Sequence, residues 1–109
     1  MLFVNVEDFL NQAKNIPPLS REEERELGQQ KAAGDSTARE TLVRYHLPMV
    51  AACVRRAPQE IRTLHTVYAC IASLEQGVDG FNFLQDGETF THHLSWRLRQ
   101  CLTRCIAER

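Results

Sequence analysis

The 109-residue chain lacks several features that would point to particular classes of protein. No apolar run approaches the roughly 20 residues that a membrane-spanning helix needs, so we expect no membrane association. No glycine-rich loop suited to phosphate groups is present and no nucleophile is paired with a base, so we expect neither an enzyme nor a bound cofactor. The chain has no large net charge, because its 13 Lys and Arg residues nearly balance its 14 Asp and Glu residues. Any affinity for nucleic acid must therefore come from a local basic surface.

The four cysteines all lie among apolar neighbours and are Cys53, Cys70, Cys101 and Cys105. The N-terminus has no basic stretch followed by an apolar run, so we expect a cytoplasmic protein without a disulfide framework. Cys101 and Cys105 are one helical turn apart and follow His92 and His93, which leaves a zinc site as an alternative. We favour the simpler interpretation that the cysteines fill the core, because they fall on the apolar stripe of their helix.

Helix-start and helix-stop signals organise the first half of the chain. A first helix is expected at about residues 6–15 and ends before Pro17, because proline has no amide hydrogen to continue a helix. Ser20 and Glu23 form a capping-box pattern that begins a second helix, which runs to Gly34. The aspartate after this glycine can cap a third helix. The second and third helices should therefore form a hairpin.

The second half of the chain shows similar punctuation. Pro48 is expected to begin a further helical stretch, after no more than a kink. Apolar residues recur at helical spacing over residues 64–74, and Gly77 and Gly80 then weaken the pattern. An Asp-Gly pair at residues 86–87 marks a loop before the last helix.

Together these signals predict an all-α protein, a compact bundle of about five to six helices. The length suits one structural unit with one core. Within that unit we distinguish an N-terminal helix and connector at residues 1–19 from a helical domain at residues 20–109.

The last segment separates into two faces when it is laid on a helix at about 100° per residue. One arc is apolar and is expected to face the core; it contains Leu94, Leu98, Cys101, Leu102, Cys105 and Ile106. Trp96 falls nearly opposite this arc, and polar or basic residues surround it at Arg97, Arg99, Gln100, Thr103 and Arg104. Arginines suit phosphates, an exposed aromatic ring suits an unpaired base, and Gln and Thr reach base edges. The alternative is that the tryptophan packs against the preceding loop and the arginines only solvate the helix.

Three segments resemble the sigma-70 family of transcription initiation factors. They are VEDFLNQAKNIPPLSREEEREL at 6–27, GDSTARETLVRYHLPMVAACVRR at 34–56 and FTHHLSWRLRQCLTRCIAER at 90–109. Their order and spacing are similar to regions 1.2 to 2.4 of the family, without its C-terminal domains. The resemblance implies a protein that performs no catalysis and captures non-template bases of the promoter minus-ten element by binding energy. It also implies core RNA polymerase as a partner.

The resemblance assigns DNA-binding roles along the last helix. Gln100 and Thr103 match positions that face the upstream part of the minus-ten element. Trp96 matches the first of two adjacent tryptophans that wedge against the duplex edge. Arg99 and Arg104 match basic positions suited to phosphate contact.

Of three further positions on this surface, one matches the family residue and two carry a different residue. Phe90 matches an aromatic residue that helps to form a pocket for an extruded base. Arg97 replaces the second tryptophan, and His93 replaces a tyrosine that stacks on a flipped adenine. An imidazole can stack, but with less surface. The alternative for His93 is an exposed histidine with no role.

The larger departure lies at residues 64–74, LHTVYACIASL, where the family has an acidic helix that docks on core polymerase. One hypothesis is a sigma-like domain that still joins core RNA polymerase or binds single-stranded promoter DNA, with a second polypeptide supplying the missing sigma domain. The other is a repurposed sigma-fold module, without DNA binding, that binds a protein partner through an apolar surface. The residues expected on that surface are Leu64, Val67, Tyr68 and Ile71.

Overall fold

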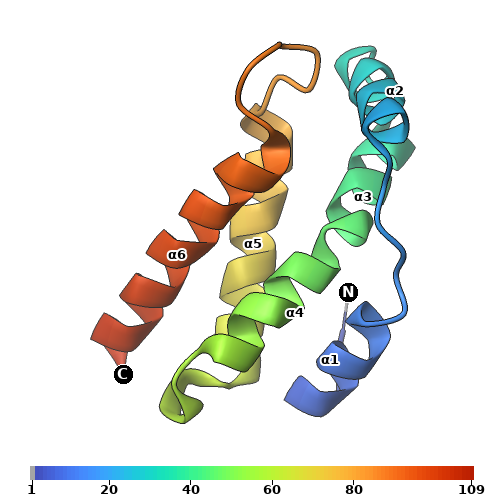
Figure 1. Cartoon of the computed structure of the whole chain (residues 1–109). Helices are drawn as coiled ribbons and strands as arrows, with labels where there is room; N and C mark the ends of the chain where they lie inside the picture. Colours follow the sequence, from blue (N-terminus) through green and yellow to red (C-terminus); the bar gives the residue numbers. More distant parts are fainter. Residues whose placement is uncertain (1) are drawn as a thin grey trace.

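The computed structural model describes residues 2–109 and shows an all-helical bundle (Figure 1). The helices are α1 (Val6–Ala13), α2 (Arg21–Ala32), α3 (Ser36–Tyr45), α4 (Leu47–Arg56), α5 (Leu64–Gly80) and α6 (Phe90–Glu108), with a 3-10 turn, η1 (Gln59–Ile61), before α5. No strand occurs in residues 2–109, so the predicted all-α class is confirmed. None of the helices in this part of the chain combines the length and apolarity that crossing a membrane requires.

The α2–α3 hairpin forms as the sequence predicted. The Ser20 hydroxyl accepts a hydrogen bond from the Glu23 amide at 3.1 Å, and the Glu23 carboxylate accepts one from the Ser20 amide at 3.0 Å. The turn between the helices places Gly34 at φ +96°, which glycine adopts without steric cost. Asp35 then caps α3 by accepting a hydrogen bond from the Thr37 amide at 2.9 Å.

Only His46 separates α3 from α4, and its buried ring links three helices. Its Nδ1 lies 2.7 Å from the Leu42 carbonyl oxygen. Because a carbonyl only accepts hydrogen bonds, Nδ1 must carry the proton. Its Nε2 lies 3.2 Å from the Glu24 carboxylate of α2, and the ring meets the Phe90 ring of α6 edge-on at 4.7 Å. His46 therefore fixes the start of α6 relative to the hairpin.

Helix α5 continues through Gly77 to Gly80, although the glycines predicted a weaker pattern there. Contacts from other helices support its last turn. The Lys31 ammonium donates hydrogen bonds to the carbonyl oxygens of Val78, at 2.7 Å, and Phe81, at 3.1 Å. These carbonyls at the helix end have no partner within the helix, so a lysine from α2 satisfies them.

The core lies mainly between α4, α5 and α6, and α1 packs on α4. All four cysteines are free thiols; Cys53 is half-buried and the other three are buried. Burial raises the pKa of the Cys53, Cys70 and Cys105 thiols, so these side chains stay protonated at neutral pH. Their positions confirm the interpretation that the cysteines fill the core.

Candidate nucleic-acid interface

Helix α6 begins after a loop at residues 81–89, in which Gly87 takes the left-handed value φ +116°. The Thr89 hydroxyl caps the helix by accepting a hydrogen bond from the His92 amide at 3.1 Å. The predicted stripe is buried at Leu94, Leu98, Cys101 and Cys105. Leu102 is only half-buried, and the prediction that Ile106 is buried was wrong, because 41% of this residue is exposed. Both residues border an open groove between α4 and α6 instead of a packed helix.

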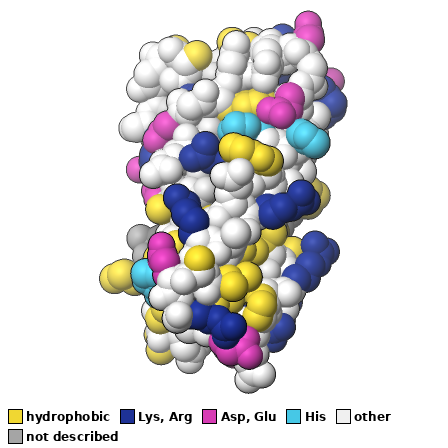
Figure 2. Space-filling view, turned by 90° about the vertical axis from the view of Figure 1, so that its left-hand side faces the viewer, with side chains coloured by type: hydrophobic (Ala, Val, Ile, Leu, Met, Phe, Trp, Pro, Cys, Tyr) yellow, Lys and Arg dark blue, Asp and Glu magenta, His cyan; other side chains and the backbone are white. Residues whose placement is uncertain are grey.

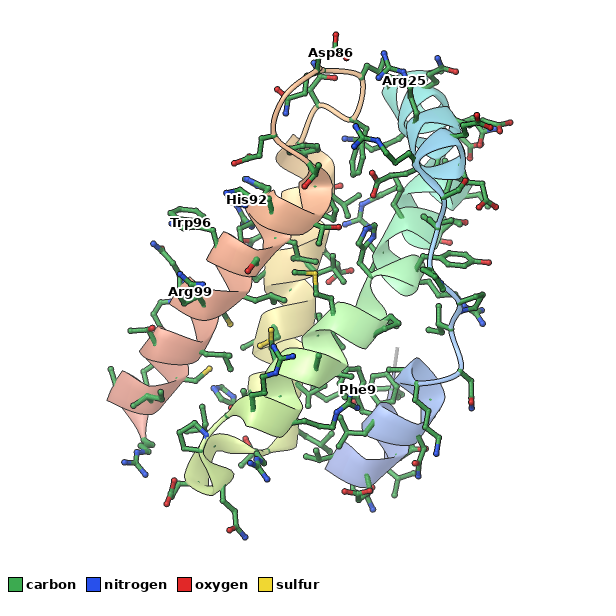
Figure 3. All side chains as sticks on the ribbon, in the orientation of Figure 1. Phe9, Arg25, Asp86, His92, Trp96 and Arg99 are labelled. Carbon is green, nitrogen blue, oxygen red and sulfur yellow. The ribbon has the colours of Figure 1, made fainter. Side chains whose placement is uncertain are left out.

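The side of α6 opposite the buried stripe is exposed. Trp96 is 54% exposed, which contradicts the alternative that its ring packs against the preceding loop. Its exposed neighbours, with which it forms what we call the outer face of α6, are Arg99, Gln100, Thr103 and Arg104. Figure 3 shows Trp96 and Arg99 projecting away from the bundle. Figure 2 shows basic side chains spread over the middle and lower parts of this side of the molecule.

Arg97 does not belong to the outer face, which corrects its predicted placement. Its Nε donates a hydrogen bond to the Ser73 carbonyl oxygen at 3.1 Å, and its Nη2 donates one to the Gln76 side chain at 3.2 Å. A Cβ atom at Gly77 would lie only 3.1 Å from the Arg97 side chain. The glycine of α5 therefore makes room for an arginine that joins α5 to α6.

The first turn of α6 carries an aromatic cluster. The Phe90 ring is buried, 5.3 Å from Phe81 and 4.9 Å from Phe83 between ring centroids. Phe90 can thus shape a neighbouring pocket but has almost no surface to contact a base. The half-buried His93 ring lies 5.3 Å from the Phe81 centroid, and its Nδ1 is 3.4 Å from the Glu88 carboxylate. His93 therefore has packing partners and is not an idle surface residue.

A pocket of about 380 Å³ lies between the start of α2, the 81–89 loop and the first turn of α6. The rings of Phe81, Phe83 and Phe90 line it, together with charged residues that include Arg25 and Glu88. The Arg25 guanidinium bridges the two sides by donating a hydrogen bond to the Leu84 carbonyl oxygen at 3.1 Å. Aromatic walls with polar groups at the rim suit an unstacked base. The sequence resemblance placed Phe90 at a pocket but gave no sign of the α2 wall, because no local pattern connects residues some 60 positions apart.

The predicted partner surface on α5 is largely absent, which is a second correction. Val67 and Ile71 are buried in the core and cannot contact a partner. Leu64 and Tyr68 are half-buried, and Tyr68 contacts the N-terminal segment. The Tyr68 hydroxyl accepts a hydrogen bond from the Phe3 amide at 2.8 Å, and the two rings stack at 6.1 Å.

Comparisons with known proteins agree with this arrangement of helices. Residues 5–37, which contain α1, its connector and α2, match the family described as Sigma-70 factor, region 1.2. Over 101 residues the chain is 31% identical to the RNA polymerase sigma factor SigA of Clostridium acetobutylicum. The aligned part is 92% of this chain but 26% of SigA, so the chain spans about a quarter of the length of this relative. These two matches show that the chain is similar to part of a sigma-70 factor, with region 1.2 at residues 5–37.

Proposed function

We propose that the chain is a sigma-like module without catalytic activity that binds single-stranded promoter DNA of the minus-ten type through the outer face of α6. The observation that carries this proposal is the exposure of Trp96, 54%, directly opposite the buried stripe of the same helix. An exposed tryptophan among donors and cations has no packing role to explain it. Base stacking on such a ring contributes roughly 1–3 kcal/mol per base, which makes Trp96 the energetic centre of the surface.

The residues around Trp96 would contact the phosphates and the base edges of the strand. Arg99 and Arg104 supply charge to phosphates, and Gln100 can donate to and accept from base edges. The Thr103 hydroxyl donates its hydrogen to the Arg99 carbonyl oxygen at 2.9 Å, so towards DNA it acts as an acceptor. With few arginines on the face, few counterions are released, and we expect a shallow salt dependence.

The aromatic pocket beside α6 extends this proposal. A base turned away from the strand on α6 would enter between the 81–89 loop and α2. Its ring would lie against Phe81 and Phe83, with His93 packed behind Phe81. Phe90, which is almost fully buried, would hold these two rings by packing against both of them.

Core RNA polymerase is the proposed protein partner, because the relative that the chain matches is an RNA polymerase sigma factor. Burial of Val67 and Ile71 leaves other residues of α5 for such a contact. The exposed residues on that helix include His65, Ala72 and Gln76. A pull-down with tagged protein from the host lysate should recover polymerase subunits, and a variant with these three positions changed to Glu should not.

Fluorescence anisotropy tests the DNA proposal. Labelled single-stranded oligonucleotides of minus-ten and scrambled sequence, and a duplex, are titrated with and without core polymerase. We expect a preference for the minus-ten strand and a loss of roughly 1–3 kcal/mol for Trp96→Ala. Leu2→Ala is the matched control, because Leu2 is an apolar side chain that is 90% exposed and lies outside α6. Equal binding of both strands, unaffected by Trp96→Ala, would refute the proposal.

A further inference from the structure

We propose that the groove between α1 and α4 is a docking site for an acidic amphipathic helix of a partner protein. This groove, which we call the α1–α4 groove, lies between one face of α1 and the segment from Val54 to Arg62, and has a volume of about 670 Å³. No residue of α5 or α6 lines it, and Figure 1 shows α1 and α6 on opposite sides of α4. The site is therefore separate from the outer face of α6, and the inference does not rest on the proposed function.

The floor of the α1–α4 groove is aliphatic. Val6 and Leu10, one turn apart on α1, and Val54 of α4 supply it. At about 100° per residue, the apolar arc of α1 runs from Phe9 through Ala13 and Val6 to Leu10. Phe9 and Ala13 are buried, whereas Val6 and Leu10 are only half-buried. The apolar arc of α1 is therefore wider than the part that the bundle covers, and its uncovered side lies in the groove.

Three cations surround this floor, namely Lys14, Arg55 and Arg62. None of them forms an ion pair with any residue in the range 2–109. The Arg62 guanidinium is held in place because its Nε donates a hydrogen bond to the Ala57 carbonyl oxygen at 2.7 Å. Within the described chain, Glu7 is the one carboxylate that lines the groove. The rim thus carries an excess of positive charge, which carboxylates of a partner would complement.

An acidic helix fits this groove better than nucleic acid does. No aromatic ring from residues 2–109 lines it, so it offers no platform for a base, and the Glu7 carboxylate would repel a phosphate. A helix that docks in a groove does so through apolar side chains three or four positions apart. Leucines at that spacing would pack on Val6, Leu10 and Val54, and glutamates beside them would face the cations of the rim.

A designed peptide tests the proposal. The probe is a fluorescein-labelled helical peptide with leucines at positions i, i+4 and i+7 and glutamates on both sides of this row. Fluorescence anisotropy follows its binding to the whole chain. One control peptide has lysines in place of the glutamates, and another has serines in place of the leucines. We expect only the first peptide to bind, because it alone supplies both the apolar row and the negative charge.

Charge reversal on the protein locates the bound peptide. Arg55→Glu and Lys14→Glu should each weaken binding about five- to tenfold, because repulsion replaces attraction. Both side chains are exposed, so the fold should be kept, which circular dichroism verifies. Arg56→Glu is the matched control, because Arg56 is the next residue of α4, is also exposed and lines a different groove, against α6. This control should change the affinity less than about twofold.

The outcomes separate the possible occupants of the groove. Losses confined to Lys14→Glu and Arg55→Glu support the helix site. An equal loss for Arg56→Glu, or equal binding of the serine peptide, would mean diffuse attraction by charge and would overturn it, as would no binding at millimolar concentration.

Two further results would assign the α1–α4 groove to another occupant and so overturn the proposal. One is displacement of the peptide by DNA that persists in Trp96→Ala, which indicates nucleic acid. The other is dimerisation in sedimentation experiments that Arg55→Glu abolishes, which indicates a second copy of the chain. None of these measurements requires DNA to bind through Trp96, so the inference and the proposed function can fail independently.

Discussion

Helices α5 and α6 lie side by side, and the sequence suggested a binding surface on each, yet they use their side chains differently. On α6 the apolar residues turn inwards, and Trp96 stays exposed among polar groups. On α5 the apolar residues expected to face a partner, Val67 and Ile71, are core residues. An aromatic residue opposite an apolar stripe was correctly predicted to be exposed. The apolar residues at 64–74, where the resembling family has an acidic helix, did not predict an exposed surface.

The difference has a physical cause. The buried apolar residues of α6 all lie on one side of the helix, so helical periodicity alone distinguishes its buried face from its exposed face. Helix α5 packs against α3, α4 and α6 and buries side chains in several directions. A helix surrounded in this way is apolar over most of its circumference, and the pattern no longer shows which side is free.

The largest effect expected from this comparison is the loss of folding when a charge enters the buried side of α5. Val67 is fully buried in the apolar core, so Val67→Asp places a carboxylate out of contact with water. We expect a loss of about 4 kcal/mol or more, against a total stability of roughly 5–15 kcal/mol for a domain of this size. His65→Asp, on the exposed side, should cost less than about 1 kcal/mol. Urea unfolding followed by circular dichroism measures both, and similar midpoints would mean that Val67 is on the surface.

A smaller effect is expected within α6. Leu98 is fully buried, and Leu98→Ala should cost about 2–5 kcal/mol because it leaves a cavity. Ile106→Ala removes a side chain of similar size from the edge of the groove and should cost about 1 kcal/mol or less. Thermal unfolding of the two variants tests the difference. Equal shifts in Tm would show that the last turn is packed as the sequence originally predicted.

Local signals were predictable from the sequence, and contacts between distant segments were not. Ser20, Glu23 and Asp35 act on amides two or three residues away, so a pattern within one turn was sufficient. The end of α5 depends on Lys31, almost 50 residues away, and could not be read from the glycines. Ile106 lies on the apolar stripe but at a helix end where no element covers it.

The candidate site likewise has features that the sequence predicted and features that depend on contacts between distant segments. The exposed positions of the outer face followed from periodicity. The placement of Arg97 depended on Gly77 in another helix, and the aromatic pocket depended on how the 81–89 loop meets α2. Neither of these contacts between distant segments can be recognised from the sequence of one segment alone.

The smallest expected effect concerns the polar contact that ties α5 to α3. Arg39 donates hydrogen bonds to Asp79, including one from Nη2 at 3.0 Å, and these lower the pKa of the Asp79 carboxyl below its ordinary value of 3.8. A lowered pKa contributes stability that is complete above the unfolded value and is lost as the pH falls through the folded value. The pair is exposed, so we expect less than about 1 kcal/mol, lost below about pH 4.

Asp79→Asn should remove this pH-dependent part of the stability. Asp86→Asn is the control, because Asp86 is an exposed carboxyl in the 81–89 loop. The measurement is urea stability between pH 3 and pH 6. If the wild-type protein and Asp79→Asn lose stability in parallel as the pH falls, the ion pair contributes nothing.

The contact between Gly77 and Arg97 limits how this sequence can change. A Cβ atom at position 77 would lie 3.1 Å from the Arg97 side chain, which is tighter than an ordinary contact. An alanine at position 77 therefore requires that the side chain at position 97 give way, and a bulky tryptophan at position 97 loses both hydrogen bonds to α5. Positions 77 and 97, on separate helices, are thus coupled: a larger residue at position 77 constrains the side chain at position 97, and loss of Arg97 removes the two hydrogen bonds that join α6 to α5.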